Sequence, residues 1–143
     1  MIQLKTNAPA YFADLADVVR VFFDEAVSAD EGDRTIGHAH AQAEGGWSET
    51  CAFEGVTQSA FVPQVSSALE QKRLIKRAAK ICLYDLLKRA TGRKPPWGSL
   101  TGIRPTRLLY EALEGGKTEP QAEAWLRDVF DVSPSKTTLL REI

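Results

Sequence analysis

The stretch TIGHAHAQAEGGWSETCAF, residues 35–53, consists of two alternating runs on either side of a glycine pair. Alternation of apolar and polar side chains over residues 35–43, and again over 47–53, is the pattern of half-buried strands. Gly45-Gly46 allows a tight turn between them, because glycine readily adopts the positive φ that such turns require. This stretch therefore predicts an antiparallel β-hairpin.

The segments around this hairpin extend it into a small α+β unit. IQLKT, residues 2–6, alternates in the same way and predicts a short strand. Residues 9–27 place apolar side chains at helical spacing, which predicts an amphipathic helix. After the hairpin, SAFVPQV suggests a further extended segment, in which Pro63 favours a sheet edge or a strand end. We therefore expect an α+β subdomain over residues 1–65, a small antiparallel sheet with one packed helix in the order β-α-β-β.

The second half, residues 66–143, is predicted to be a helical subdomain. Ser66 or Ser67 is placed to cap a long helix that runs to about Ala90, and Gly92 follows as a stop signal. One apolar stripe runs along this helix, formed by Leu69, Ile75, Ala79, Cys82, Leu86 and Ala90. The outer face of the helix is basic.

Three shorter helices are expected after it, which completes a four-helix C-terminal half. The first begins at Pro105, where a proline suits the first helical turn. The second begins with a capping box formed by Thr118 and Gln121. Its apolar residues are Ala122, Trp125, Leu126, Val129 and Phe130. The third begins at Ser133, and its apolar helical pattern is still uninterrupted at Ile143, the last residue of the sequence. This suggests that the chain is a fragment.

Positive charge is concentrated in one segment of the chain. Residues 72–107 carry eleven basic residues against Asp85 alone, whereas residues 1–71 are strongly acidic. Four of the basic residues recur at helical spacing and share one face, which we call the basic face: Arg73, Lys76, Arg77 and Lys80. Such a face fits a nucleic acid, a polycarboxylate ligand or an acidic protein surface, and a solvated helix face is the alternative. The sequence does not favour RNA as the partner, because its aromatic residues mostly recur at the spacing of core positions and so provide no stacking platform for bases.

A proline-rich joint, PPWGSLTGIRPTR at residues 95–107, connects two of the predicted helices. Prolines restrict the residues before them and the two glycines permit tight turns, so the connector is stiff. Trp97 is suited to pack on an apolar surface beneath the connector. Arg104 and Arg107 lie at or near the N-terminus of the following helix, where a carboxylate or phosphate is favourable. A purely structural connector is the alternative. The candidate docking or substrate-binding residues are therefore Arg73, Arg77, Lys80, Trp97, Arg104 and Arg107.

The sequence singles out no catalytic residue and no metal site. His38 and His40 share one strand face, but no third ligand is signalled nearby, so two polar positions on a solvent-facing side are the preferred interpretation. Cys51 and Cys82 lack a local motif and are expected to pack as buried thiols. The chain has no Gly-rich phosphate loop of either common type.

The composition and the apolar runs exclude further classes. Hydrophobic residues make up 43% and charged residues 26% of the chain, as in globular domains, so disorder is not expected. No apolar run approaches the roughly 20 residues of a membrane span. The N-terminus lacks the basic and apolar regions of a secretory signal. We therefore expect a cytoplasmic location and no membrane partner.

The stretch YDLLKRATGRKPPWGSLTGIRPTRL, residues 84–108, resembles a segment of the HemZ type of oxygen-independent coproporphyrinogen III oxidases. In that family a helix ending in T-G-K leads to L-P-W-G-x-L-T-G-I-R-P-T-K. The matching positions are Trp97, Gly98, Leu100, Thr101, Gly102, Ile103, Arg104, Pro105 and Thr106. Pro95 replaces a more common leucine, and Arg107 replaces a common lysine.

The resemblance implies a parent protein with a radical S-adenosylmethionine (SAM) barrel that follows this chain. Such enzymes of haem and porphyrin biosynthesis are oxidoreductases that decarboxylate two propionates of coproporphyrinogen III to vinyl groups. Their C-x-x-x-C-x-x-C cysteines hold a [4Fe-4S] cluster, and that motif is not in this sequence. The chain would then be an accessory N-terminal domain without a cofactor or catalytic activity of its own.

Two partners follow from the resemblance: the parent's own radical SAM domain and coproporphyrinogen III itself. The alternative to this function is an independent module that uses the basic helix, residues 72–94, to bind RNA or another polyanion or a protein. Nucleic acid is the less favoured partner, because no aromatic platform accompanies the basic face.

Overall fold

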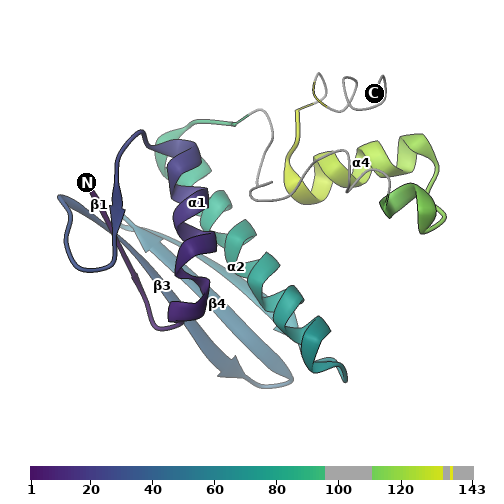
Figure 1. Cartoon of the computed structure of the whole chain (residues 1–143), viewed down its shortest axis with the longest axis horizontal. Helices are drawn as coiled ribbons and strands as arrows, with labels where there is room; N and C mark the ends of the chain where they lie inside the picture. Colours follow the sequence, from purple (N-terminus) through teal and green to yellow (C-terminus); the bar gives the residue numbers. More distant parts are fainter. Residues whose placement is uncertain (96–110, 134–135, 137–143) are drawn as a thin grey trace. The chain divides into compact units, whose positions relative to one another are not determined.

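The computed structural model describes residues 1–95, 111–133 and 136 (Figure 1). Its contacts separate two compact units, Met1–Arg93 (unit 1) and Lys94–Ile143 (unit 2). The long helix therefore belongs with the sheet, and the boundary lies after Arg93 instead of near residue 65. The reason is packing, because that helix contacts two strands of the sheet along its length.

Unit 1 is built on one five-stranded sheet in the order β2-β1-β3-β4-β5. The strands are β1 (Ile2–Thr6), β2 (Val27–Ser28), β3 (Arg34–Ala43), β4 (Gly46–Phe53) and β5 (Val56–Pro63). The predicted hairpin is confirmed as β3 and β4, and β5 continues it as an antiparallel meander. Strand β1, however, pairs in parallel with both β2 and β3, so the sheet is mixed and not purely antiparallel.

The first helix is shorter than expected. After a 3-10 turn at Pro9–Tyr11, α1 spans Phe12–Phe22, and Phe23 already has extended dihedral angles (φ −127°, ψ 129°). The predicted end near residue 27 is wrong because Val27 pairs with Ile2 as part of β2. A strand that returns through a helix lies parallel to the strand it left, which explains the parallel pairing of β1 and β2.

The second helix, α2, spans Ala68–Thr91 between two local stop signals. The Ser67 side chain accepts a hydrogen bond from the Glu70 N–H, and Gly92 ends the helix with a φ of 71°. Most of the predicted stripe is buried or half-buried, but Leu69 is 61% exposed. Leu69 lies in the first turn of α2, where no residue is buried; the first buried residue is Ile75.

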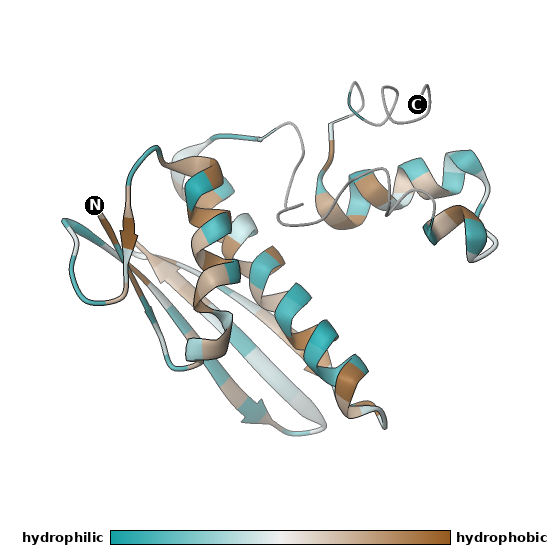
Figure 2. Ribbon diagram, in the orientation of Figure 1, coloured by the Kyte–Doolittle hydropathy of each residue, from teal (hydrophilic) through white to brown (hydrophobic). Residues whose placement is uncertain are grey.

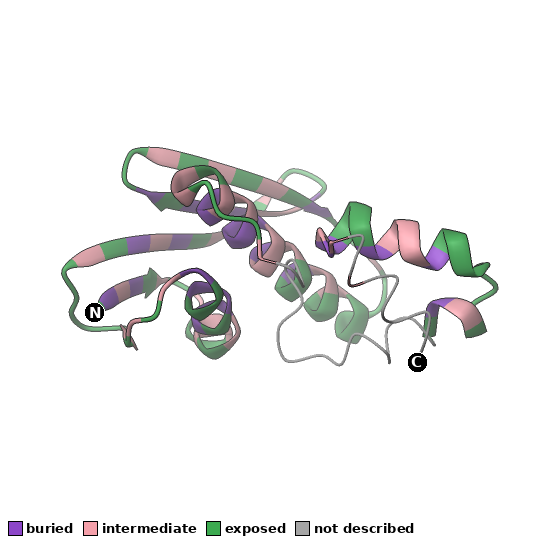
Figure 3. Ribbon diagram, turned by 90° about the horizontal axis from the view of Figure 1, so that it is seen from above, coloured by how far each residue is buried: buried purple, intermediate pink, exposed green. Residues whose placement is uncertain are grey.

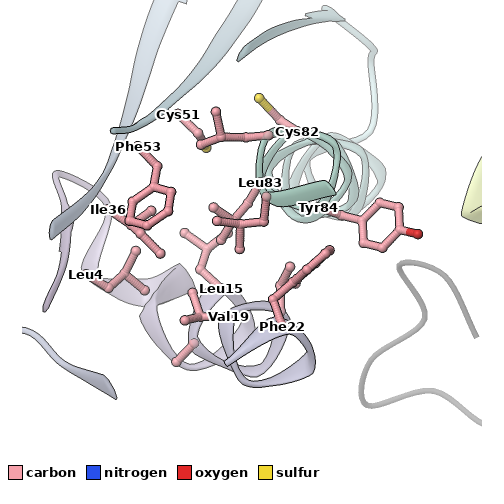
Figure 4. Packing of buried hydrophobic residues seen from close by; sticks show 14 of the residues in the cluster. Leu4, Leu15, Val19, Phe22, Ile36, Cys51, Phe53, Cys82, Leu83 and Tyr84 are labelled. Atoms are coloured by element: carbon pink, nitrogen blue, oxygen red, sulfur yellow. The ribbon is translucent and has the colours of Figure 1, made fainter. Parts of the chain in front are cut away.

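The core of unit 1 lies between one face of the sheet and the two helices α1 and α2 (Figures 1 and 3). Two helices therefore cover the sheet, one more than the sequence predicted. Hydrophobic and hydrophilic residues alternate along the ribbons of α1 and α2 (Figure 2), and the residues that both helices bury are apolar. Figure 4 shows how side chains from the sheet and from both helices converge, including Leu4, Leu15, Ile36 and Leu83. Each of these four side chains is fully buried.

In unit 2 the described helices are residues 111–114 and α4 (Glu119–Phe130). Thr118 and Gln121 form the predicted capping box. Ala122, Leu126 and Phe130 are buried, whereas Val129 is 38% exposed and not part of the core. The start of the helix predicted at Pro105, and most of the one predicted after Ser133, lie outside the described residues. Across the described residues, no helix has the length and hydrophobicity that crossing a bilayer requires.

Candidate functional site

The basic face of α2 is partly used inside unit 1. Lys76 Nζ lies 3.2 Å from Asp14 Oδ2, which links α2 to α1. Both side chains remain partly exposed, so this ion pair contributes about 0–1 kcal/mol to stability. Asp14 of α1 therefore already pairs with one of the four cations that the sequence interpretation assigned to an external partner.

Lys80 is a half-buried member of the basic face. Burial lowers the pKa of its ammonium group, and the positive charges of Lys76 and Arg77 lower it further, while Asp14 and Asp17 oppose the shift. The net effect is a destabilised charged form. Lys80 is therefore less suited to bind an external anion than an exposed arginine is.

We expect Lys80→Met to leave the protein as stable as the wild type, or slightly more stable, at pH 7. Because the folded pKa is lowered, the unfolded chain binds more protons at pH values between the folded and unfolded pKa, so wild-type stability rises with pH there. This rise should be smaller in the variant. Urea unfolding between pH 7 and 10 measures it, and a marked loss of stability at pH 7 would show that the ammonium group is stabilising.

Of the other candidate residues, Arg73 and Arg77 are exposed on α2. Two cations nearer the end of the segment have structural partners. Arg89 Nη1 donates to the Thr57 carbonyl oxygen at 3.2 Å, and Arg93 Nη1 donates to the Phe22 carbonyl oxygen at 2.6 Å. The exposed candidates therefore concentrate in the first half of α2. Trp97, Arg104 and Arg107 lie outside the described residues.

A buried carboxylate joins the two histidines of β3, and the sequence interpretation missed it. Glu49 on β4 is fully buried, with Oε1 3.1 Å from His38 Nε2 and Oε2 2.6 Å from His40 Nδ1. His38 is 5% exposed, so the expectation of a solvent-facing pair is wrong. Alternation explains the result, because His38 and His40 follow the buried Ile36 at intervals of two and therefore share the helix-covered face.

The hydrogen bonds of His38 form a continuous chain. Thr6 Oγ1 accepts the Ala8 N–H at 3.0 Å and lies 2.7 Å from His38 Nδ1. A hydroxyl has one proton to give, and all partners are satisfied when Thr6 donates to Nδ1 and His38 carries its proton on Nε2, facing Glu49. This cluster therefore ties β1, β3 and β4 together through side chains.

His40 forms the partly exposed end of the same cluster, at 24% side-chain exposure. Its ring stacks on Trp47 at 5.1 Å between centroids and meets the edge of Tyr11 at 6.1 Å. Burial, with a smaller effect from the Glu49 carboxylate, raises the pKa of Tyr11. Chemically, the arrangement is a carboxylate–imidazole pair at the partly exposed end of the cluster.

The two cysteines are free, buried thiols, as expected. Cys82 Sγ lies 3.3 Å from the Gln58 carbonyl oxygen, to which it donates. A hydrogen bond with Cys82, followed by burial, raises the pKa of Cys51, so this thiol stays protonated. Nowhere in the described part of the chain do three His, Cys, Asp or Glu residues come together to hold a metal ion.

No family model and no solved structure matches the chain. It does resemble HemZ. The chain is 35% identical over 83 residues to the "Oxygen-independent coproporphyrinogen-III oxidase-like protein HemZ" of Bacillus subtilis (strain 168). The aligned stretch spans 58% of this chain and 16% of HemZ, so the chain corresponds to a small part of that protein. The resemblance that residues 84–108 predicted is thereby confirmed.

The extent of the HemZ match bears on the basic face. A continuous stretch of 83 residues in a chain of 143 cannot begin after residue 61 or end before residue 83. The region similar to HemZ therefore contains Arg73, Arg77 and Lys80, together with most of α2. Glu49 lies outside residues 61–83, the stretch that every possible position of the match includes.

Proposed function

We propose that this chain is the N-terminal accessory domain of an oxygen-independent coproporphyrinogen III oxidase-like radical SAM enzyme of haem and porphyrin biosynthesis. The observation that carries the proposal is the 35% identity to HemZ over 83 residues. The parent protein is then a cytoplasmic oxidoreductase, and its catalytic part lies beyond this chain.

The [4Fe-4S] cluster and SAM belong to that other part of the parent protein. A radical SAM cluster takes three thiolates from one motif and leaves one iron open for the cofactor. This chain has two cysteines, both buried, and the pKa of Cys51 is raised, which opposes the thiolate form. The donor set does not fit the cluster, so the chain itself takes no part in holding it.

The contribution of this domain is binding. Arg73 and Arg77 are exposed, and guanidinium groups pair well with carboxylates. Coproporphyrinogen III carries four carboxylates, and an acidic surface of the radical SAM domain offers the same chemistry. Either partner gives the exposed first half of α2 a function that a solvated helix face lacks.

The test uses the full-length parent protein under anaerobic conditions, with its cluster reconstituted and with SAM, a reductant and coproporphyrinogen III. We expect decarboxylated products by chromatography and a loss of roughly tenfold or more in kcat/KM for R73E/R77E, because each charge-assisted contact contributes about 1.5–3 kcal/mol. The matched control is K5E/K117E, which makes the same charge change at exposed lysines outside α2.

Two outcomes would overturn the proposal. A wild-type parent that leaves coproporphyrinogen III unchanged removes the assigned activity. Equal kcat/KM for R73E/R77E, for the control and for the wild type removes the binding role of the basic face. Binding of single-stranded RNA by this chain, with an affinity that falls steeply as salt rises, would favour the independent polyanion-binding module instead.

A further inference from the structure

The two cysteines of this chain meet where α2 packs on the sheet. Cys51 lies on β4 and is buried on the helix-covered side, and Cys82 lies on α2, which contacts β4 and β5. Both belong to the hydrophobic core, with exposed fractions of 0% and 2%. Figure 4 shows the two side chains next to each other, one from the sheet and one from the helix.

Three contacts place the Cys82 sulfur beside Cys51. Cys82 Sγ lies 3.7 Å from the Glu49 carbonyl oxygen and 3.3 Å from the Gln58 carbonyl oxygen. Gln58 is the residue of β5 that pairs with Cys51 of β4. The third contact is a hydrogen bond between the two thiols themselves. Two sulfurs in this contact need only a small movement to reach the bond length of a disulfide, about 2.05 Å.

The two thiols are not equivalent. The hydrogen bond with Cys51 lowers the pKa of Cys82 against the effect of burial, whereas the same bond and burial raise the pKa of Cys51. Cys82 therefore reaches the thiolate form more readily, and the thiolate is the form that oxidants attack. Cys82 also contacts β5, the last strand of the sheet in the described part of the chain, so it lies nearer the rim of the core.

We propose that Cys51 and Cys82 form a site of reversible oxidation, at which hydrogen peroxide converts the two thiols into a disulfide within one molecule. The Cys82 thiolate attacks one peroxide oxygen, the O–O bond breaks, and the departing hydroxide takes up the proton that Cys82 released. The Cys51 sulfur then attacks the Cys82 sulfenic acid, the S–O bond breaks, and the departing hydroxide leaves as water with the Cys51 proton. Each sulfur is oxidised by one electron, and each peroxide oxygen is reduced by one.

The disulfide joins α2 to β4 covalently. It closes a loop that runs from β4 through β5 into α2, and such a link restricts the unfolded chain more than the folded one. Helix α2 also carries Arg73 and Arg77, so the oxidation acts on the helix that presents the basic face. Disulfides inside reducing compartments are mostly transient and redox-sensing, which fits a reversible site. This inference does not depend on the proposed enzymatic role.

The experiment treats the reduced, folded chain with hydrogen peroxide at pH 7. Mass spectrometry of the intact protein should show the loss of two hydrogen atoms, and dithiothreitol should reverse it. The chain has two cysteines, so a disulfide within one molecule joins this pair. Non-reducing electrophoresis identifies disulfides between molecules, and circular dichroism confirms that the protein and its variants are folded.

Two single variants separate the roles of the thiols. C51S keeps a hydroxyl that can donate to Cys82, and it should stop at a sulfenic acid that dimedone labels. C82S is the matched control, and its remaining thiol should react roughly tenfold more slowly or less, because Cys51 is the poorer thiolate. Equal labelling rates for the two variants would overturn the assignment of Cys82 as the attacking thiol.

The same treatment of the protein unfolded in urea supplies the reference for exposed thiols. A folded wild type that keeps both thiols while the unfolded chain loses them would overturn the proposal and leave the cysteines as inert core residues. Disulfides that form only between molecules would overturn it as well. So would an oxidised protein with a lower urea midpoint than the reduced one, because the disulfide would then not fit the native contact.

Discussion

Glu49→Gln is expected to lower the free energy of unfolding by about 3 kcal/mol, because it removes a buried charge that two imidazoles share. The carboxylate accepts from both His38 and His40, and its side chain has no exposed surface. A glutamine amide keeps one acceptor oxygen for His38, but its NH2 group can bond His40 Nδ1 only if that ring carries its proton on Nε2, and both contacts lose the strength of a charge-assisted hydrogen bond. Urea unfolding at pH 7, followed by circular dichroism, measures the loss.

The matched control for this variant is Thr50→Ala, the next residue of β4. Its hydroxyl lies 3.3 Å from that of Ser59 on an exposed surface, so we expect a loss below about 1 kcal/mol. A double-mutant cycle with His40→Ala should show positive coupling between positions 40 and 49. If Glu49→Gln costs no more than Thr50→Ala, the buried cluster does not stabilise the fold.

Leu83→Ala is expected to destabilise unit 1 by about 3–4 kcal/mol, because it opens a cavity in the centre of the core. Leu83 lies on α2, is 0% exposed and is packed among side chains of α1 and the sheet, near Leu15 and Ile36 (Figure 4). The surrounding layers are held by strand pairing and helix packing, so the cavity is not closed at low cost. Urea unfolding measures the effect as a shift of the midpoint.

Leu69→Ala makes the same chemical change on the same helix and serves as its control. Leu69 is 61% exposed in the first turn of α2, so its truncation should change stability by no more than about 0.5 kcal/mol. Equal losses for Leu83→Ala and Leu69→Ala would contradict the placement of the core. A large difference would confirm that only the part of the predicted stripe from Ile75 onward is buried.

Elements with local signals were predictable from the sequence. The β3–β4 hairpin depends on Gly45, which adopts a φ of 77° that other residues rarely adopt. The ends of α2 depend on a capping Ser67 and a terminal Gly92, and the start of α4 depends on the Thr118 capping box. Each of these features involves residues within a few positions of one another, so the sequence carries the whole interaction.

The buried cluster of His38, His40 and Glu49 was not predicted from the sequence. His38 and His40 alternate with Ile36, and Glu49 alternates with Cys51, so the shared face of these residues was available from the pattern. The pairing of His40 with Glu49 was not assigned, although it follows once the hairpin register is known. The sequence interpretation gave the polar type of these residues more weight than their alternation with buried residues. The structure shows that the alternation predicts their burial correctly.

The sequence alone determined the α+β class, the hairpin, the long basic helix and the resemblance to HemZ, because short-range patterns and one motif carry them. The tertiary structure decided the parallel pairing of β1 and the position of α2 on the sheet. It also showed that Lys76 of the basic face pairs with Asp14 of α1. These features join segments separated by tens of residues, and such contacts are selected by packing of the whole unit, which no local pattern encodes.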